Sequence, residues 1–185
     1  MGLLLSLHIS LIDMNQLNTS PWRILLVKPR FERKAEKLLV KAEYNVYVPV
    51  QTQLRRWSDR LKKVDTLLFP GFVFVATDDK ISVEAYKSEI MYGFMQRYEA
   101  GKKSPLVLKE SDMAMIRRLT QLEAPVTILQ HCPAPGDRVE IISGPLTGYT
   151  GEVTGILGSQ RVLLSIPGLQ CMAQVEMRPH QLRRI

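Results

Sequence analysis

The chain has 185 residues, 45% hydrophobic and 23% charged, which is the composition of a globular protein with room for one ordinary domain or two small ones. Its formal charge is +7, and the excess lies in residues 22–130, with 20 Lys and Arg against 13 Asp and Glu, whereas residues 131–185 carry 5 against 4. A basic surface attracts nucleic acid, an anionic membrane or an acidic protein, so charge alone does not choose the partner. Two cysteines are too few for a disulfide framework, and we expect a cytoplasmic setting.

Residues 1–20 are expected to be an extension outside the folded part. The apolar run from Leu3 to Ile12 is shorter than the roughly 20 residues that span a bilayer, and no Lys or Arg precedes Arg23. The missing charges argue against a signal peptide and favour a disordered extension or a true start at Met14 rather than Met1. No membrane partner is expected.

Residues 21–123 have the pattern of an α+β domain, with an antiparallel sheet and helices on one face. Pro21 and Pro29 bound a short apolar strand, and the next segment has helical spacing of its apolar residues. The expected strands are residues 22–27, 46–50, 67–76 and 91–97, and the expected helices are 31–42, 82–89 and 111–123, the last capped by Ser111.

The pattern changes after Ala124. Residues 124–134 are predicted to be a linker, and residues 135–185 a small β-barrel. Seven Gly and five Pro between positions 133 and 185 separate short β-rich runs at 138–142, 151–156, 161–165 and 171–175.

Residues 136–153 read GDRVEIISGPLTGYTGEV and resemble a KOW motif, which implies an SH3-like barrel. In a hairpin of this kind, glycines supply turn conformations that a Cβ would resist, and alternate apolar residues face the core. The motif begins at Gly136; the expected turn residues are Gly144, Gly148 and Gly151, and the expected core residues are Val139, Ile141 and Val153.

A second motif, LFPGFVFV at residues 68–75, follows Trp57-Ser58-Asp59-Arg60, and Trp22 opens the first strand. Together these residues resemble the amino-terminal domain of the NusG family, whose members place that domain before a KOW domain. The resemblance runs from about Trp22 to Ile185. The arm and the Phe-Pro-Gly-Phe strand are most similar to specialised members of the RfaH and UpxY type, which act on polysaccharide operons.

The resemblance implies that an apolar face of the first domain docks on the clamp of the largest RNA polymerase subunit. Carried over residue by residue, that face would include Trp22, Phe69, Pro70 and Phe72. The alternative is that these are core residues of an ordinary strand, since alternate residues of a strand face opposite sides.

Residues 54–63 carry five cations against one Asp, interleaved with an indole ring. This combination contacts phosphates and stacks on unpaired bases, so we predict contact with the nucleic acid of the elongation complex. The alternative is a solvated hairpin tip, as most charge runs are. The candidate residues are Arg55, Arg56, Trp57, Arg60, Lys62 and Lys63.

No enzymatic activity, cofactor or metal is expected. No P-loop, dinucleotide fingerprint or catalytic triad pattern is present. His131, Cys132, Cys171 and His180 lack the short spacing of a structural metal site.

The sequence therefore predicts a transcription elongation and antitermination factor for long operons, which suppresses pausing or termination. Two alternatives stay open: a general housekeeping factor of the same family, and an RNA- or ribosome-binding KOW protein that does not act on polymerase. The KOW domain could also contact a ribosomal protein or a termination factor. Pro167 stands where many family members have a Phe that meets a ribosomal protein, which puts that contact in question.

RfaH is a family member that can hold this region as a helical hairpin. A helix over the KOW region is disfavoured, because an interior Gly costs about 1 kcal/mol and an interior Pro about 3 kcal/mol relative to Ala. The residues concerned are Gly144, Pro145, Gly148, Gly151, Gly155 and Gly158. We therefore expect a barrel over residues 136–180.

Overall fold

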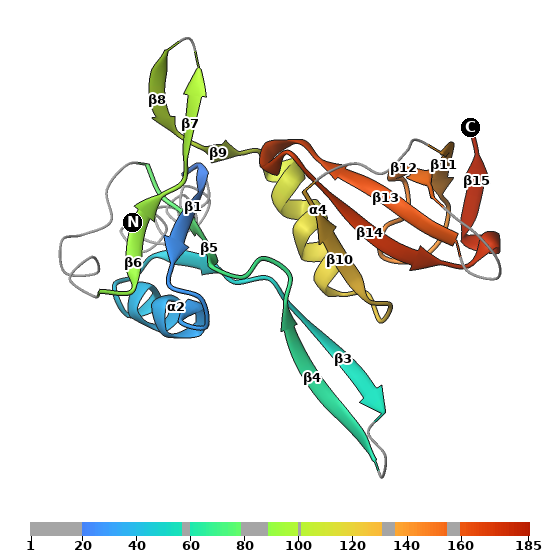
Figure 1. The fold of residues 1–185 in the computed structure, drawn as a ribbon, viewed down its shortest axis with the longest axis horizontal. Coiled ribbons are helices and arrows are strands. Elements are labelled where there is room, and N and C mark those ends of the chain that lie inside the picture. Colours follow the sequence, from blue (N-terminus) through green and yellow to red (C-terminus); the bar gives the residue numbers. More distant parts are fainter. Residues whose placement is uncertain (1–19, 57–59, 79–88, 100, 131–135, 155–159) are drawn as a thin grey trace, which may run out of the picture. The chain divides into compact units, whose positions relative to one another are not determined.

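The computed structural model describes residues 20–56, 60–78, 89–99, 101–130, 136–154 and 160–185. The chain forms two compact units. The first unit takes the chain as far as Tyr47 and then Phe72–Val107, and the second takes Val48–Gly71 and Leu108–Ile185 (Figure 1). The predicted domain of residues 21–123 is thus shared between the two units, while the expected extension 1–20 lies, except for Ser20, outside the described residues.

An antiparallel sheet with one helix makes up most of the first unit. The strands lie in the order β2-β5-β1-β6, and β9 also pairs with β1. The elements are β1 (Trp22–Val27), α2 (Glu32–Lys41), β2 (Asn45–Tyr47), β5 (Phe72–Ala76), β6 (Met91–Phe94) and β9 (Val107–Leu108). The predictions of a strand at 22–27 and a helix near 31–42 are confirmed. The predicted helix at 82–89 lies outside the described residues, apart from Glu89.

Strand β5 is buried on both faces at its centre. Phe74 faces one side and Val73 and Val75 the other, and all three are fully buried. On α2, Ala35 and Leu39 are fully buried, so the helix packs its apolar stripe inward and leaves its lysines in solvent. Because both faces of β5 are buried, the LFPGFVFV run has no polar residues at the centre of this strand.

The strand predicted at 91–97 is divided into two strands, β6 and β7 (Gln96–Glu99), which pair with different neighbours. The Met95 N–H donates to the Ile24 carbonyl at 2.8 Å, which continues the β6 pairing with β1. The Leu106 N–H donates to the Met95 carbonyl, also at 2.8 Å, which starts a hairpin of β7 and β8 (Lys102–Pro105). This hairpin, not predicted from the sequence, extends beyond the sheet of the first unit (Figure 1).

The second unit contains a long hairpin, a helix and a barrel. The hairpin is formed by β3 (Val50–Arg56) and β4 (Leu61–Leu67), so the predicted strand at 46–50 is divided between β2 and β3. Helix α4 (Glu110–Thr120) begins one residue before the predicted cap. The expectation that Ser111 caps it was wrong: Lys109 holds the cap position, and its N–H donates to the Asp112 carboxylate at 3.2 Å.

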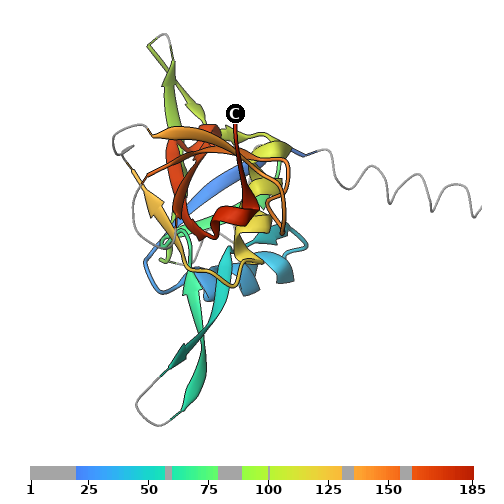
Figure 2. The same cartoon turned by 90° about the vertical axis from the view of Figure 1, so that its right-hand side faces the viewer.

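Six antiparallel strands curl into the predicted barrel, as Figure 2 shows. Their order is β10-β14-β13-β12-β11-β15. The strands are β10 (Val126–Leu129), β11 (Asp137–Ile141), β12 (Thr150–Val153), β13 (Gln160–Ile166), β14 (Cys171–Met177) and β15 (Leu182–Arg184), with the single 3₁₀ turns η1 (Pro167–Leu169) and η2 (Pro179–Gln181). Within the described part of residues 136–180 the only helical segments are these turns, so the predicted barrel is confirmed there.

The segment predicted to be a linker contains a barrel strand. Residues 126–129 pair with β14 in the register Val126↔Val175 to Leu129↔Met172. Val126, Thr127 and Ile128 are β-branched residues with β propensity, but Pro125 beside them favoured the prediction of a linker. Residues 131–135 lie outside the described part of the chain.

The KOW glycines have two different roles. Gly144 and Gly148 have φ values of +88° and +86°, and so supply the expected turn conformations. Gly151 instead lies in β12, where an added Cβ would stand 2.6 Å from the Leu163 carbonyl oxygen. The prediction of a turn at Gly151 was therefore wrong, because this residue is needed for close strand approach.

Two of the three expected core residues of the KOW motif are buried. Val139 and Ile141 are buried as predicted, whereas Val153 is only half-buried. Gly136, at the start of the motif, is also held by close approach, because a Cβ there would overlap the Val153 carbonyl.

We expect Gly151→Ala to destabilise the protein by about 1–3 kcal/mol, because the added methyl group collides with the Leu163 carbonyl as well as with the Val162 and Leu164 side chains. Urea unfolding of the full chain, followed by circular dichroism, measures this. Thr150→Ala, at the exposed neighbouring position, is the matched control and should leave the midpoint within about 0.5 kcal/mol. Equal midpoints for the two variants would contradict the proposed close approach.

Candidate functional site

The β3–β4 hairpin has two chemically different faces. Directly opposed residues of an antiparallel pair share a face, and the register runs from Val50↔Leu67 to Arg56↔Leu61. One face presents Leu54 and Leu61, which are 65% and 66% exposed. The other face carries the buried Gln51 and Gln53 near the base of the hairpin.

Gln51 anchors the base of the hairpin to the rest of the second unit. It is fully buried, and its amide nitrogen donates to the Leu122 and Ala124 carbonyls at 2.8 and 2.7 Å. Its amide oxygen accepts from the Val126 N–H at 3.2 Å and from the Gln53 amide at 2.6 Å. Both donors and the acceptor of the side chain are therefore satisfied. This one amide therefore connects β3, the segment that follows α4 and the start of β10.

The predicted cations occupy the far half of this hairpin. Arg60, Lys62 and Lys63 are exposed. Arg55 and Arg56 lie in β3, where their side chains are outside the described part, and Trp57 lies outside it altogether.

The register places two cations in direct opposition, Arg55 across from Lys62. Lys63 lies opposite Leu54 and shares its face with Leu61, so a cation and apolar surface stand together on that face. This arrangement can contact a phosphate backbone and an apolar group at the same time.

The predicted docking residues differ sharply in exposure. Trp22 and Phe69 are only 7% and 5% exposed, Phe72 is half-buried and Pro70 is exposed. Trp22 and Phe72 share one face of the first unit's sheet, because Trp22 pairs with Ala76 and Leu26 with Phe72. Phe69 and Pro70 belong to the second unit. The role of these residues in docking stays a prediction, and Phe69 in this structure is a core side chain.

Helix α4 contacts two turns of the barrel within the second unit. The Arg118 guanidinium donates to the Pro145 carbonyl at 3.1 Å and lies over the Tyr149 ring, 5.4 Å from its centroid. At the other end of the helix, a Cβ added at Gly168 would stand 2.5 Å from an Asp112 carboxylate oxygen. The turn that contains Pro167 therefore lies against α4, although Pro167 itself is exposed.

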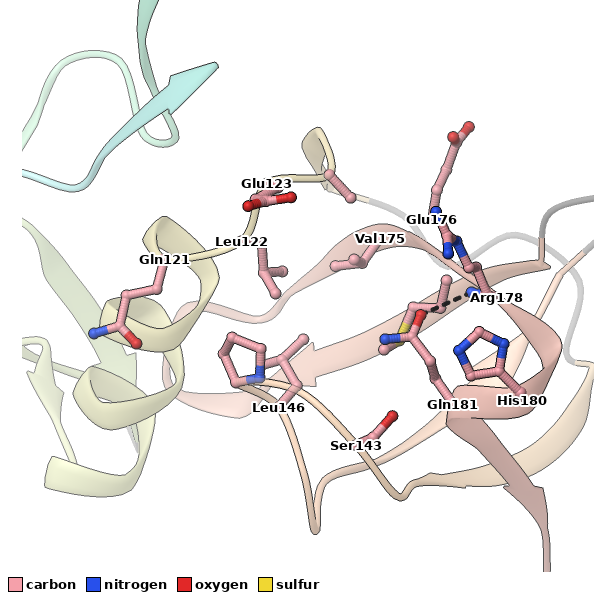
Figure 3. Close-up of a pocket in the computed structure, with 13 residues that line it drawn as sticks. Gln121, Leu122, Glu123, Ser143, Leu146, Val175, Glu176, Arg178, His180 and Gln181 are labelled. Atoms are coloured by element: carbon pink, nitrogen blue, oxygen red, sulfur yellow. Dashed lines mark hydrogen bonds between the residues drawn. The ribbon is translucent and has the colours of Figure 1, made fainter. Parts of the chain in front are cut away.

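An open cavity of about 740 Å³ lies between the segment after α4 and the barrel (Figure 3). Leu122, Leu146 and Val175 supply apolar lining, and Glu123, Glu176 and Arg178 lie at its polar side. Gln181 closes one end, where its amide oxygen accepts the Arg178 N–H at 3.0 Å. Both carboxylates and a guanidinium line this cavity, so its lining does not indicate a ligand of one charge.

The described residues do not assemble a metal centre. They contain no group of three or more His, Cys, Asp and Glu side chains placed to hold an ion. Cys171 is buried in β14, and burial raises the pKa of its thiol to about 11, so the thiolate that binds metals is disfavoured near neutral pH. His131 and Cys132 lie outside the described residues. Over the part of the chain that the structure describes, no helix is long and apolar enough to span a membrane.

Comparison with known proteins agrees with this architecture. The family model described as "Transcription termination factor nusG" matches residues 20–117, and the KOW motif model matches residues 135–165. A protein of Lactococcus lactis subsp. lactis named "Transcription termination/antitermination protein NusG" is 26% identical over 175 residues, which cover 89% of this chain and 92% of the relative. The solved structure titled "Domain interaction in Thermotoga maritima NusG" aligns at 23% identity over 91% of this chain and 99% of that one, with a TM-score of 0.55, and supports the fold. The chain belongs to the NusG family and is a transcription factor of that family.

We expect Gln51→Leu to destabilise the second unit by at least about 2 kcal/mol, since a buried polar group without a partner costs about 1–3 kcal/mol and several would lose theirs. Gln51→Glu should act in the same direction, because it keeps the shape and removes both donors. Urea unfolding and amide exchange at Val126 are the measurements. Thr52→Val, at the exposed neighbouring position, removes the hydrogen bond that the Thr52 hydroxyl donates to the Asp65 carboxylate at 2.6 Å, and it is the control for the loss of a surface hydrogen bond. Unchanged stability and unchanged exchange in both Gln51 variants would show that this amide is not the anchor.

Proposed function

We propose that the chain is a transcription elongation and antitermination factor that binds RNA polymerase at its clamp and suppresses pausing or termination. The observation that carries the proposal is the succession of a NusG domain and a KOW barrel along one chain. Binding is the whole mechanism: a factor that favours the closed clamp over the open, paused arrangement shifts the population toward elongation.

The geometry of the β3–β4 hairpin supports contact with nucleic acid in that complex. Its base is fixed by buried Gln51, while Arg60, Lys62 and Lys63 remain exposed toward its far end. A fixed base and a cationic end suit a group that must reach phosphates from a bound position.

The docking face on polymerase is proposed to include Trp22, Phe69, Pro70 and Phe72. Pro70 and Phe72 offer accessible apolar surface, whereas Trp22 and Phe69 are nearly covered. A contact with Phe69 would require that side chain to become accessible.

We further propose that the factor serves long operons of the polysaccharide type. The support is the Trp-Ser-Asp-Arg arm together with the LFPGFVFV strand, which resemble the specialised members of the family. A general role has its own support in the extended match to the Lactococcus protein. Transcript profiling after deletion of the gene separates the two: loss of distal transcripts in one operon indicates the specialised role, and genome-wide changes indicate the general one.

We expect the combined change of Arg60, Lys62 and Lys63 to Gln to weaken antitermination and its dependence on salt. Each lost phosphate contact should lower the slope of log affinity against log salt by about 0.7–0.9. Single-round transcription through a terminator, with cognate polymerase at several salt concentrations, gives the readout. Changing Lys37, Lys41 and Lys109 to Gln removes the same charge from exposed positions elsewhere and serves as the control. If both triple variants behave alike, the hairpin is only a solvated arm.

We expect Pro70→Asp to weaken binding to polymerase by about tenfold or more, because it would place an unpartnered carboxylate in an apolar interface. Pro70 is exposed, so the fold should be kept, whereas Phe69→Ala would also cost core packing. Pro29→Asp, at another exposed proline, is the control. Pull-down with purified polymerase decides; equal retention of the two variants would remove Pro70 from the docking face.

A further inference from the structure

The β7–β8 hairpin presents an aromatic ring and cations on a surface that the proposed function does not use. Tyr98 is 72% exposed, which makes it the most exposed large apolar side chain of the described residues. Its cross-strand partner is Lys103, whose ammonium lies 5.8 Å from the ring centroid. This contact uses only part of the ring, as the exposure of Tyr98 shows.

The hairpin is held at its root rather than along its length. Backbone bonds from Met95 to Ile24 and from Leu106 to Met95, both 2.8 Å, tie it to the first unit's sheet. At its far end Gly101 has a φ of +76° and no atom within 4 Å of a built Cβ.

The charge of this hairpin is positive. Residues 96–105 carry Arg97, Lys102 and Lys103 against Glu99 alone. In the ladder, Lys102 lies opposite Glu99 and Lys103 lies opposite Tyr98. An acidic partner with flat rings matches this surface better than an apolar or a basic one.

The barrel provides a contrast, because three of its arginines form ion pairs with carboxylates on the neighbouring strand. Arg161 pairs with Glu176, Arg183 with Glu140 and Arg184 with Asp137. On the β7–β8 hairpin, the Lys103 ammonium lies over the Tyr98 ring instead. Such a cation beside an exposed ring can meet a phosphate while the ring stacks on a base.

We propose that the β7–β8 hairpin is a second nucleic-acid contact, at which Tyr98 stacks on an unpaired base and Lys103, with Lys102, binds the adjacent phosphates. The ligand class is single-stranded nucleic acid read without base specificity, because every base offers a face for stacking. This inference goes beyond the proposed function and does not depend on polymerase.

The test measures binding of the full chain to a fluorescein-labelled dT12 strand by anisotropy. Tyr98→Ala should weaken binding at least about fivefold, while Tyr98→Phe, which keeps the ring, should bind like the parent protein. Tyr92→Ala is the matched control, because Tyr92 is 66% exposed on β6. A duplex of the same length should respond little to Tyr98→Ala, since its bases are already stacked.

A second experiment tests the role of the two lysines. Changing Lys102 and Lys103 to Ala should reduce the salt dependence of dT12 binding, and changing Lys37 and Lys41 to Ala should not do so to the same extent. Equal dT12 binding by Tyr98→Ala and the parent protein, or an equal loss in Tyr92→Ala, would overturn the proposal. Either result would leave the polymerase experiments above untouched, because no polymerase is present in this assay.

Discussion

The second unit depends on one buried amide. Gln51 links β3 to the Leu122 and Ala124 carbonyls and to the Val126 N–H, so a strand of the hairpin, the segment after α4 and the first barrel strand meet at a single side chain. A buried amide is stabilising only when all its partners are present, because each partner left alone in the interior is costly. The direction of the basic hairpin is therefore set by the same bonds that begin the barrel.

The extended and helical parts of the chain with strong periodicity could be predicted from the sequence. The apolar run at Trp22–Val27 and the helical stripe of α2 were placed to within a residue, because local pattern and burial agree there. The β7–β8 hairpin was missed, since Tyr98 and Lys103 stabilise it by a cross-strand contact rather than by a buried face. Strand β10 was missed because its register is set by β14, which is more than forty residues away in the sequence.

The candidate site could be predicted only in part. Charge density located the arm at residues 54–63, but no sequence signal distinguishes Gln51 from an exposed polar residue of an alternating strand. The motif at residues 68–75 marked the family, yet motif membership does not separate a core Phe from a docking Phe, and Phe69 is buried here. The role of Gly151 could not be predicted either. The sequence indicates a turn at this glycine, whereas the structure requires a glycine there because β12 and β13 approach closely.

Strand β10 affects where this protein can be divided. The KOW motif model begins at residue 135, but the barrel sheet begins at Val126, and β10 covers the outer edge of β14 from Met172 to Val175. A fragment cut at the motif boundary would leave the backbone N–H and C=O groups of that edge unpaired, and an uncovered edge strand is a template for pairing with another chain. The smallest soluble form of this barrel therefore includes residues that the family boundary assigns to neither domain.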